Sequence, residues 1–416
     1  MSIAGDEGVE SPMLFLTNFY YPGPQATGVC IHQLAKEITH TGKQAYVVCN
    51  NQGSEPKSEC LDGIHVQRVD MPRYRYWNYP VVTSPRGLKQ RALSFLGKMI
   101  GFSKKLFHFR KYPLRDGVLT RRYVRTVSAL IEQHGIRTVV ATFNPVECIE
   151  AGAILKKKYP QVTFVYYSLD TLSNEKGSGL LPVRFRERQG VKMEQRYFAI
   201  YDRVLLMNCH RTHYSQAAFL RYADKICYAD FPLFSPIEGA GGASKDRNSI
   251  VYTGYLYRGI RNPAPVLRML SPVLGEYTVH FYGSGDCDDI LSGFEDRFPG
   301  RICRHGQVSH DRVIRAILSA DVLLSIGNAG TDMAPSKIYE YMSTGKSILH
   351  FYADEQDPCL PVFEKYGNAL CVKIGDEDAE QSIRDFLEQS HEMQVDGIRE
   401  LFKTSLPSYT VDLIGR

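Results

Sequence analysis

The chain has 416 residues, of which 44% are hydrophobic and 23% charged, and its formal net charge is +5. This length exceeds what one hydrophobic core supports, so we expect two domains. The composition is that of an ordinary globular protein. The ten cysteines are scattered singly, without a CxxC pair or a Cys/His group at zinc spacing. This pattern favours reduced thiols over a disulfide framework or a metal site.

The N-terminus and the apolar runs indicate a cytoplasmic protein. Residues 1–11 are acidic and have no apolar stretch, so we expect neither a signal peptide nor an anchor. No apolar run approaches the roughly 18 residues that a membrane span needs.

Short apolar strands alternate with helices along the first half of the chain. Strands are predicted at 13–17, 44–49, 64–69, 138–143, 163–167 and 204–208, and a helix at 29–39. This alternation is typical of a parallel sheet. Residues 231–248 are rich in Gly, Pro and Ser and are predicted to form a loop.

The same alternation restarts after this loop. Strands are predicted at 250–253, 278–282, 302–304, 322–326 and 347–351. We therefore expect an α/β protein with two Rossmann-like halves, joined by a linker near residue 240.

Residues 321–351 combine a strand, a loop, a helix and a second strand. The helix is expected to start at Pro335, so the preceding loop lies at the carboxyl end of a buried strand. Ligands bind at that place in open α/β sheets, and a helix N-terminus favours phosphate. Glu340 lies in the expected helix and Asp332 in the loop before it. The alternative is an ordinary buried βαβ unit.

The run PSKIYEYMSTGKSIL resembles the nucleotide-sugar signature of retaining GT-B glycosyltransferases of family 4, in particular the subgroup that builds bacterial surface polysaccharides. The resemblance implies that Glu340 holds the ribose hydroxyls and that Ser336 and Lys337 belong to the nucleotide-sugar site. Asp332 stands where the family has a glutamate that contacts the transferred sugar. This substitution is a departure, because an aspartate side chain is shorter.

The resemblance also implies a GT-B architecture, with two Rossmann-like domains facing across a cleft. Residues 1–235 would form an acceptor-binding domain with a basic aromatic insertion at 72–125. Residues 236–406 would form the nucleotide-sugar-binding domain. The tail 407–416 is expected to return to the first domain.

Further donor-site residues follow from the same resemblance. The loop 18–28 ends in Gly28, which matches the last glycine of the family's glycine-rich loop; an ordinary βα turn is the alternative. After the strand at 250–253, Gly254 opens a turn in which Arg258 loosely matches a diphosphate-binding lysine. Tyr255 replaces the family's arginine, and Arg261 is the expected substitute, because guanidinium binds phosphate in a bidentate way.

Two more positions complete the expected site. The turn His305-Gly-Gln-Val308 matches the family's base-binding turn, in which backbone groups of Val308 meet the nucleobase; a plain strand-end turn is the alternative. Asp170 follows a strand and resembles an acceptor-side aspartate, although such an acid often only caps the next helix. The expected catalytic residues are Asp332, Asp170 and Arg258.

A DxD sequence at Asp286 and Asp288 is interpreted as the start of a helix, where the dipole favours acids, so no metal is expected. No cofactor is expected besides the nucleotide-sugar substrate.

The segment 72–125 carries fourteen Lys and Arg against one acid, Asp116, together with many aromatic residues. Within it, residues 87–109 place an apolar face between basic flanks at helical spacing, as in helices that lie on anionic membranes. A helix packed on its own domain is the alternative. A nucleic-acid groove lacks any recognised motif, so no nucleic acid is expected.

The sequence therefore predicts a cytoplasmic glycosyltransferase on the inner face of a membrane. By resemblance it transfers a sugar with retention, without metal, to a glycan or lipid-linked hydroxyl acceptor. A nucleotide-sugar epimerase, or a non-catalytic GT-B-like protein that binds lipid or partners, stays open as an alternative.

Overall fold

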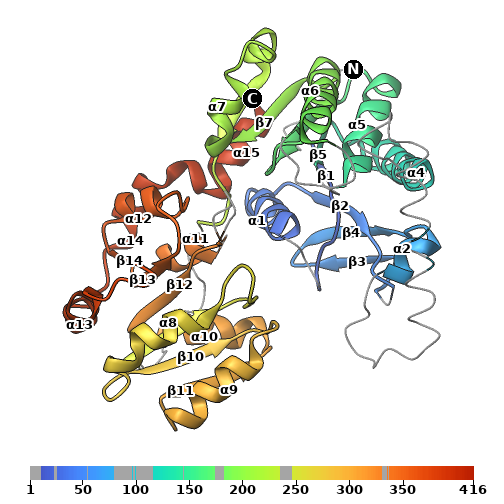
Figure 1. Ribbon diagram of the computed structural model, residues 1–416. Helices are drawn as coiled ribbons and strands as arrows, with labels where there is room; N and C mark the ends of the chain where they lie inside the picture. The colour runs from blue at the N-terminus through green and yellow to red at the C-terminus, as the bar shows by residue number, and fades with distance from the viewer. Residues whose placement is uncertain are drawn as a thin grey trace, which may run out of the picture. The chain divides into compact units, whose positions relative to one another are not determined.

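The computed structural model describes residues 11–22, 26–53, 55–78, 96, 99, 116–143, 145–173, 182–234, 246–329, 335 and 337–416. The chain divides into two compact units (Figure 1). Unit 1 comprises Met1–Pro232 and Pro407–Arg416, and unit 2 comprises Leu233–Leu406. The first boundary lies three residues before the expected one at 235/236.

Unit 1 is built on an eight-stranded sheet in the order β3-β4-β2-β1-β5-β6-β7-β8. Its strands are β1 (Met13–Leu16), β2 (Ala45–Asn50), β3 (Ser58–Leu61), β4 (Ile64–Val69), β5 (Thr138–Thr142), β6 (Thr163–Ser168), β7 (Arg203–Met207) and β8 (Ile226–Ala229). All neighbours pair in parallel except β3 with β4. The central strand β1 is buried throughout, as its apolar residues require.

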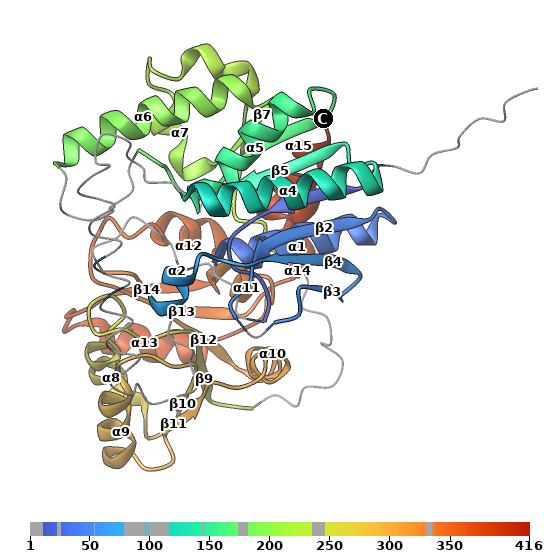
Figure 2. The same ribbon diagram turned by 90° about the vertical axis from the view of Figure 1, so that its right-hand side faces the viewer.

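Helices cover both faces of this sheet. They are α1 (Ala26–His40), α2 (Arg73–Asn78), α4 (Gly117–His134), α5 (Val146–Lys158), α6 (Val183–Ile200), α7 (Arg211–Tyr214) and α15 (Pro407–Gly415), with 3-10 turns at Asn208–His210 and Leu220–Lys225. The helices α4, α5 and α6 pack side by side (Figure 2), and α1 packs against α15. The C-terminal helix α15 also contacts β7 and β8, and Arg203 donates a hydrogen bond to the Ile414 carbonyl.

Unit 2 contains a six-stranded parallel sheet in the order β11-β10-β9-β12-β13-β14. Its strands are β9 (Ser249–Thr253), β10 (Thr278–Tyr282), β11 (Ile302–Gly306), β12 (Val322–Ile326), β13 (Ser347–Tyr352) and β14 (Ala369–Lys373). Its helices are α8 (Pro263–Leu270), α9 (Asp288–Arg297), α10 (His310–Ser319), α11 (Lys337–Met342), α12 (Leu360–Tyr366), α13 (Ala379–Glu388) and α14 (Val395–Leu401), with 3-10 turns at Ser271–Val273 and Lys403–Ser405. The helices α8, α9 and α13 line one side of the sheet in Figure 2, with α10 on the other.

In both sheets the order in which the chain adds strands reverses: strands are added first on one side of the initial strand and then on its other side. In unit 2, β9 pairs with β10 on one side and with β12 on the other. In open α/β sheets ligands bind in a crevice at such a reversal point, so this topology predicts a crevice between the loops that leave β9 and β12. In unit 1, β1 is the equivalent strand, between β2 and β5.

The strands predicted from the sequence are all present, with ends that differ by at most two residues. The prediction omitted β3, β8 and β14, which lie at the edges of the sheets. Edge strands are only partly buried, as the residues of β3 are, so their apolar pattern is weak. The helix α1 begins before its predicted start, so Gly28 lies within the helix and not in the loop.

Most of the basic aromatic segment lies outside the described residues. Between 79 and 115 only Leu96 and Met99 are described; both are helical, with 48% and 49% of their surface exposed. Asp116 is the N-cap of α4, where its carboxylate accepts hydrogen bonds from the Val118 and Leu119 N–H groups. Among the residues that the structure describes, no helix is long and apolar enough to cross a membrane.

Candidate functional site

The candidate site in unit 2 is the crevice between the loops after β9 and β12. The two loops are joined directly, because the Ala329 N–H donates to the Ile260 carbonyl at 2.9 Å. The Arg261 Nε donates to the Asn328 Oδ1 at 2.6 Å, so a cation from the β9 loop lies at the end of β12. A guanidinium group is therefore fixed at this end of the sheet, and guanidinium groups can bind anions such as phosphate.

Close backbone packing shapes the neighbouring edge of the same sheet. A Cβ atom at Gly283 would lie 1.9 Å from the Gly254 carbonyl oxygen, and one at Gly285 would lie 1.7 Å from the Leu256 carbonyl oxygen. The backbones of the two loops can therefore approach only because these residues are glycines. Gly254 also adopts φ 146°, a conformation that other residues avoid.

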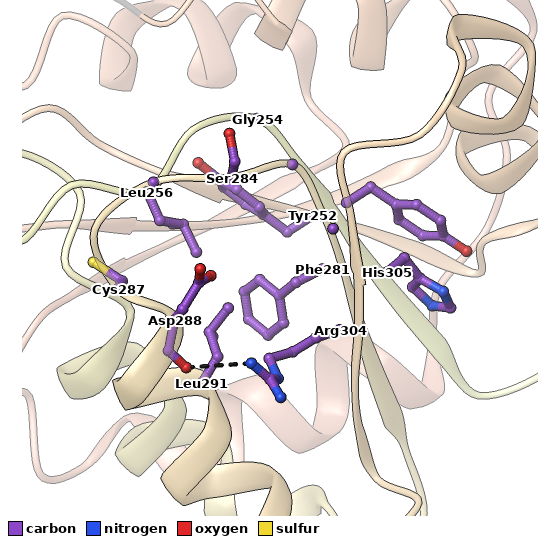
Figure 3. A pocket seen from close by; sticks show the side chains of 14 residues that line it. Tyr252, Gly254, Leu256, Phe281, Ser284, Cys287, Asp288, Leu291, Arg304 and His305 are labelled. Carbon is purple, nitrogen blue, oxygen red and sulfur yellow. Dashed lines mark hydrogen bonds between the residues drawn. The ribbon is translucent and has the colours of Figure 1, made fainter. Parts of the chain in front are cut away.

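These loops border a cavity of about 330 Å³ at the ends of β9, β10 and β11. The side chains of Leu256, Phe281 and Leu291 converge on it (Figure 3). Arg304 borders it as well and donates to the Asp288 carbonyl at 3.4 Å. The cavity has the size of a small-molecule pocket, and Gly254 forms part of its wall.

Arg258 and Arg261 have different surroundings, although three residues separate them. The Arg258 guanidinium pairs with Asp289 and its Nε donates to the Asp286 carbonyl at 3.1 Å, so it faces the start of α9. About half of its side chain is exposed, at 49%. Arg261 is partly buried at the end of β12. The structure thus places Arg261, and not Arg258, in the crevice.

The acids of the DxD sequence lie at the start of α9, as predicted. Asp288 and Asp289 occupy the first turn, and Asp286 precedes it and accepts the Arg258 N–H at 2.8 Å.

The short helix α11 follows the β12 loop. Its Tyr341 hydroxyl accepts the Thr253 N–H at 2.7 Å, which ties α11 to the end of β9. Glu340 is partly buried and pairs with Lys337 one turn earlier. The structure thus pairs two predicted nucleotide-sugar residues with each other. Asp332 and Ser336 lie outside the described residues.

The predicted base-binding turn lies between β11 and α10. Val308 is half-buried there. Among the described residues, its backbone N–H and C=O have no hydrogen-bond partner. The His305 ring stacks on Tyr282, with 4.1 Å between the ring centroids, and burial lowers the pKa of His305. A flat pair of rings thus lies at the end of β10 and β11, three residues before the turn position whose backbone groups are available to a ligand.

In unit 1, Asp170 follows β6 and is partly buried. It does not cap a helix, because α6 begins at Val183 with Pro182 as its N-cap. The loop that carries Asp170 is held by a fully buried carboxylate, Glu194, which accepts the Ser173 N–H at 3.2 Å. Burial raises the pKa of Asp170, as is common for carboxyl groups in functional sites.

Sequence reasoning missed Asn328, Tyr341 and Glu194. Asn328 had a usable signal, because it is a polar residue directly after a buried strand. Tyr341 and Glu194 lie at helix positions whose partners are distant in the chain, so only tertiary packing reveals their roles.

Several solved structures with a similar architecture are glycosyltransferases. The chain is similar to the lipopolysaccharide outer core galactosyltransferase WaaB in its apo form, with a TM-score of 0.51, 13% identity and 98% of each chain covered. It is similar to Anabaena HepE in complex with UDP, with a TM-score of 0.53, 15% identity, and 96% of this chain and 94% of that chain covered.

A third such structure is the catalytic domain of starch synthase IV from Arabidopsis thaliana bound to ADP and acarbose. Its TM-score is 0.54 at 10% identity, with 98% of this chain and 99% of that chain covered. No protein-family model matches the sequence, and comparison with curated proteins finds no significant match. At these identities the likeness concerns the fold alone: the chain has the GT-B fold.

The partly buried carboxyl of Asp170 is expected to affect the stability of unit 1 in a way that depends on pH. The pKa of Asp170 is higher in the native state than in the unfolded chain, where it has its ordinary value near 3.9. Between these two pKa values the native state keeps the proton that the unfolded chain has released. Stability therefore falls as pH rises through that window, and the ionised group is destabilising at pH 7. We expect Asp170→Asn to raise the melting temperature of unit 1 at pH 7 and to leave it unchanged below about pH 4.

The control is Asp224→Asn, which changes an exposed carboxyl in the same unit. It should change the melting temperature at neither pH. Calorimetric scans of the two variants at both pH values check this, and equal curves at pH 7 would contradict the assignment.

Proposed function

We propose that this protein is a glycosyltransferase that moves a sugar from a nucleotide-sugar to a hydroxyl acceptor. The observation that carries the proposal is the crevice at the reversal point of the unit 2 sheet, where Arg261 and Asn328 join the loops after β9 and β12. The GT-B likeness over almost the whole chain supports it, because HepE was solved with UDP and starch synthase IV with ADP and acarbose.

Each candidate donor-site residue is assigned to one part of the nucleotide-sugar. Arg261 binds the diphosphate and stabilises the charge that develops on the departing nucleotide. Glu340 accepts hydrogen bonds from the ribose hydroxyls. Lys337 then exchanges its ion pair with Glu340 for contacts with the phosphates. The available backbone groups of Val308 bind the base. Transfer with retention, and an acceptor that is a lipid-linked glycan intermediate, rest on the resemblance of the run 335–349 to family 4.

Binding of the nucleotide tests this assignment. Glu340→Ala removes charge-assisted hydrogen bonds, each of about 1.5–3 kcal/mol. We therefore expect affinity for the preferred nucleoside diphosphate, chosen from UDP, GDP, ADP and TDP by thermal shift, to fall about tenfold or more in calorimetry.

The matched control is Glu400→Ala. Glu400 pairs with Lys403 three residues away, just as Glu340 pairs with Lys337, but it lies exposed at the end of α14. It should leave the affinity unchanged. If both variants bind like the wild type, Glu340 is not a ligand of the nucleotide.

The two arginines give a second test. Arg261→Ala should lower turnover by about tenfold or more, because its cation is proposed to meet charge that grows in the transition state. Arg258→Ala should have a small effect on turnover, because its guanidinium is half-exposed and pairs with Asp289 at the start of α9. A larger loss in Arg258→Ala would reverse this assignment. Product analysis by NMR in the same assay separates transfer from epimerisation.

We also propose that the protein binds the inner face of a membrane through residues 72–125. The proposal rests on fourteen basic residues among aromatic ones in the sequence. Attraction to anionic lipid amounts to about 1 kcal/mol per basic residue near the surface and weakens with salt.

We expect the protein to float with anionic liposomes and far less with neutral ones. The triple variant K98E/K104E/K105E should lose this binding and keep its nucleotide affinity, since the proposed donor site belongs to unit 2. A wild-type protein that stays at the bottom of the gradient with anionic lipid would indicate a self-packed segment.

A further inference from the structure

Three potential metal ligands meet in the interior of unit 2. They are His350 on β13, Asp357 in the following turn and Cys359 at the N-cap of α12, and their ligand atoms lie within 4.8 Å of one another. All three are buried, with at most 7% of their surface exposed. A group of nitrogen, oxygen and sulfur atoms in such a place is of the kind that binds zinc.

The His350 ring is oriented like that of a metal ligand. Its Nδ1 is 3.0 Å from the Ser325 hydroxyl, which fixes the ring. Its Nε2 is buried and, among the described residues, has no hydrogen-bond partner. Metal-bound histidines commonly have one ring nitrogen held in this way while the other faces the ion.

The spacing of His350 and Asp357 supports the same interpretation. The distance from His350 Nε2 to Asp357 Oδ2 is 3.6 Å, too long for a hydrogen bond. A nitrogen and an oxygen on one tetrahedral zinc ion, each about 2.0 Å from it, lie about 3.3 Å apart. The other carboxylate oxygen, Oδ1, accepts the Cys359 N–H at 2.8 Å, so the carboxylate is held in place.

Cys371 on the neighbouring strand is the candidate fourth ligand; it is not among the three whose ligand atoms lie within 4.8 Å of one another, so its side chain would have to turn toward the ion. Cys371 on β14 is the register partner of His350, and paired residues of adjacent strands project from the same face of a sheet. Two cysteines, one histidine and one aspartate would complete a closed tetrahedral set.

We propose that His350, Asp357, Cys359 and Cys371 bind a structural zinc ion. With both thiols ionised, the occupied site carries one net negative charge.

The ion would stabilise the start of the β12 loop. A Cβ atom at Gly327 would lie 2.0 Å from Asp357 Oδ2, so the proposed site packs directly against this loop. The Gly327 N–H donates to the Phe351 carbonyl at 2.8 Å, next to His350 on β13. The sequence spacing conceals such a site, because its ligands come from a strand, a turn, a helix start and a second strand.

The experiment is metal analysis of the full-length protein, purified without chelator. We expect stoichiometric zinc in the wild type and in Cys303→Ser, which changes a half-buried thiol elsewhere in unit 2. Cys359→Ser and Cys371→Ser should each bind zinc about tenfold or more weakly in a chelator competition. Chelation should lower the melting temperature of the wild type and of Cys303→Ser by the same amount, and that of Cys359→Ser and Cys371→Ser much less, because a ligand of the folded state stabilises it.

Replacement of the ion by cobalt(II) in the wild type keeps the proposal testable if a variant does not fold. We expect visible bands of tetrahedral cobalt and a near-ultraviolet thiolate-to-cobalt band. Absence of zinc from the wild type, together with no cobalt spectrum, would overturn the proposal. Zinc that Cys359→Ser and Cys371→Ser retain unchanged would place the ion elsewhere and overturn it equally. Metal analysis and the cobalt spectrum do not depend on glycosyl transfer, and the proposed function is tested separately by nucleotide affinity.

Discussion

The reversal of strand order in unit 2 is the constraint on which the candidate site depends. Because β9 pairs with β10 on one side and β12 on the other, the loops after β9 and β12 leave the sheet toward opposite faces. The backbone bond between Ala329 and Ile260 and the contact of Arg261 with Asn328 then hold these loops together at their bases. The Arg261 cation is thereby positioned at the end of β12 before any ligand contributes.

Pairing between charged residues determines which of them a ligand can recruit. The Arg258 guanidinium pairs with the Asp289 carboxylate and donates to the Asp286 carbonyl, so an anion would compete with a carboxylate and a backbone oxygen for it. Lys337 and Glu340 pair with each other, and a nucleotide that offers both phosphates and ribose hydroxyls can replace both halves of that pair. Arg261 has the neutral Asn328 as its partner. Its charge is therefore the least compensated of the three cations, which makes it the strongest candidate for phosphate.

Burial of polar groups recurs next to the loops that carry candidate residues. In unit 1 the fully buried Glu194 holds the loop that follows Asp170. In unit 2 the buried Asp357 packs against Gly327, at the start of the β12 loop. A buried carboxylate is costly unless it is paired or coordinated, so these groups hold their loops in one conformation. Both loops lie at carboxyl ends of parallel strands, where rigid positioning matters most for a ligand.

The sequence by itself determined the two-unit α/β organisation, since buried parallel strands are continuous apolar runs that local composition reveals. It also located the β12 loop, α11 and the turns at Gly254 and Val308, because they follow strands directly. It did not reveal the edge strands β3, β8 and β14, whose residues are only partly buried. The tertiary structure alone separated Arg261 from Arg258, because three residues of turn place one guanidinium at the end of β12 and the other on α9. It alone brought His350, Asp357 and Cys359 together, because such contacts depend on strand pairing and helix packing and not on spacing along the chain.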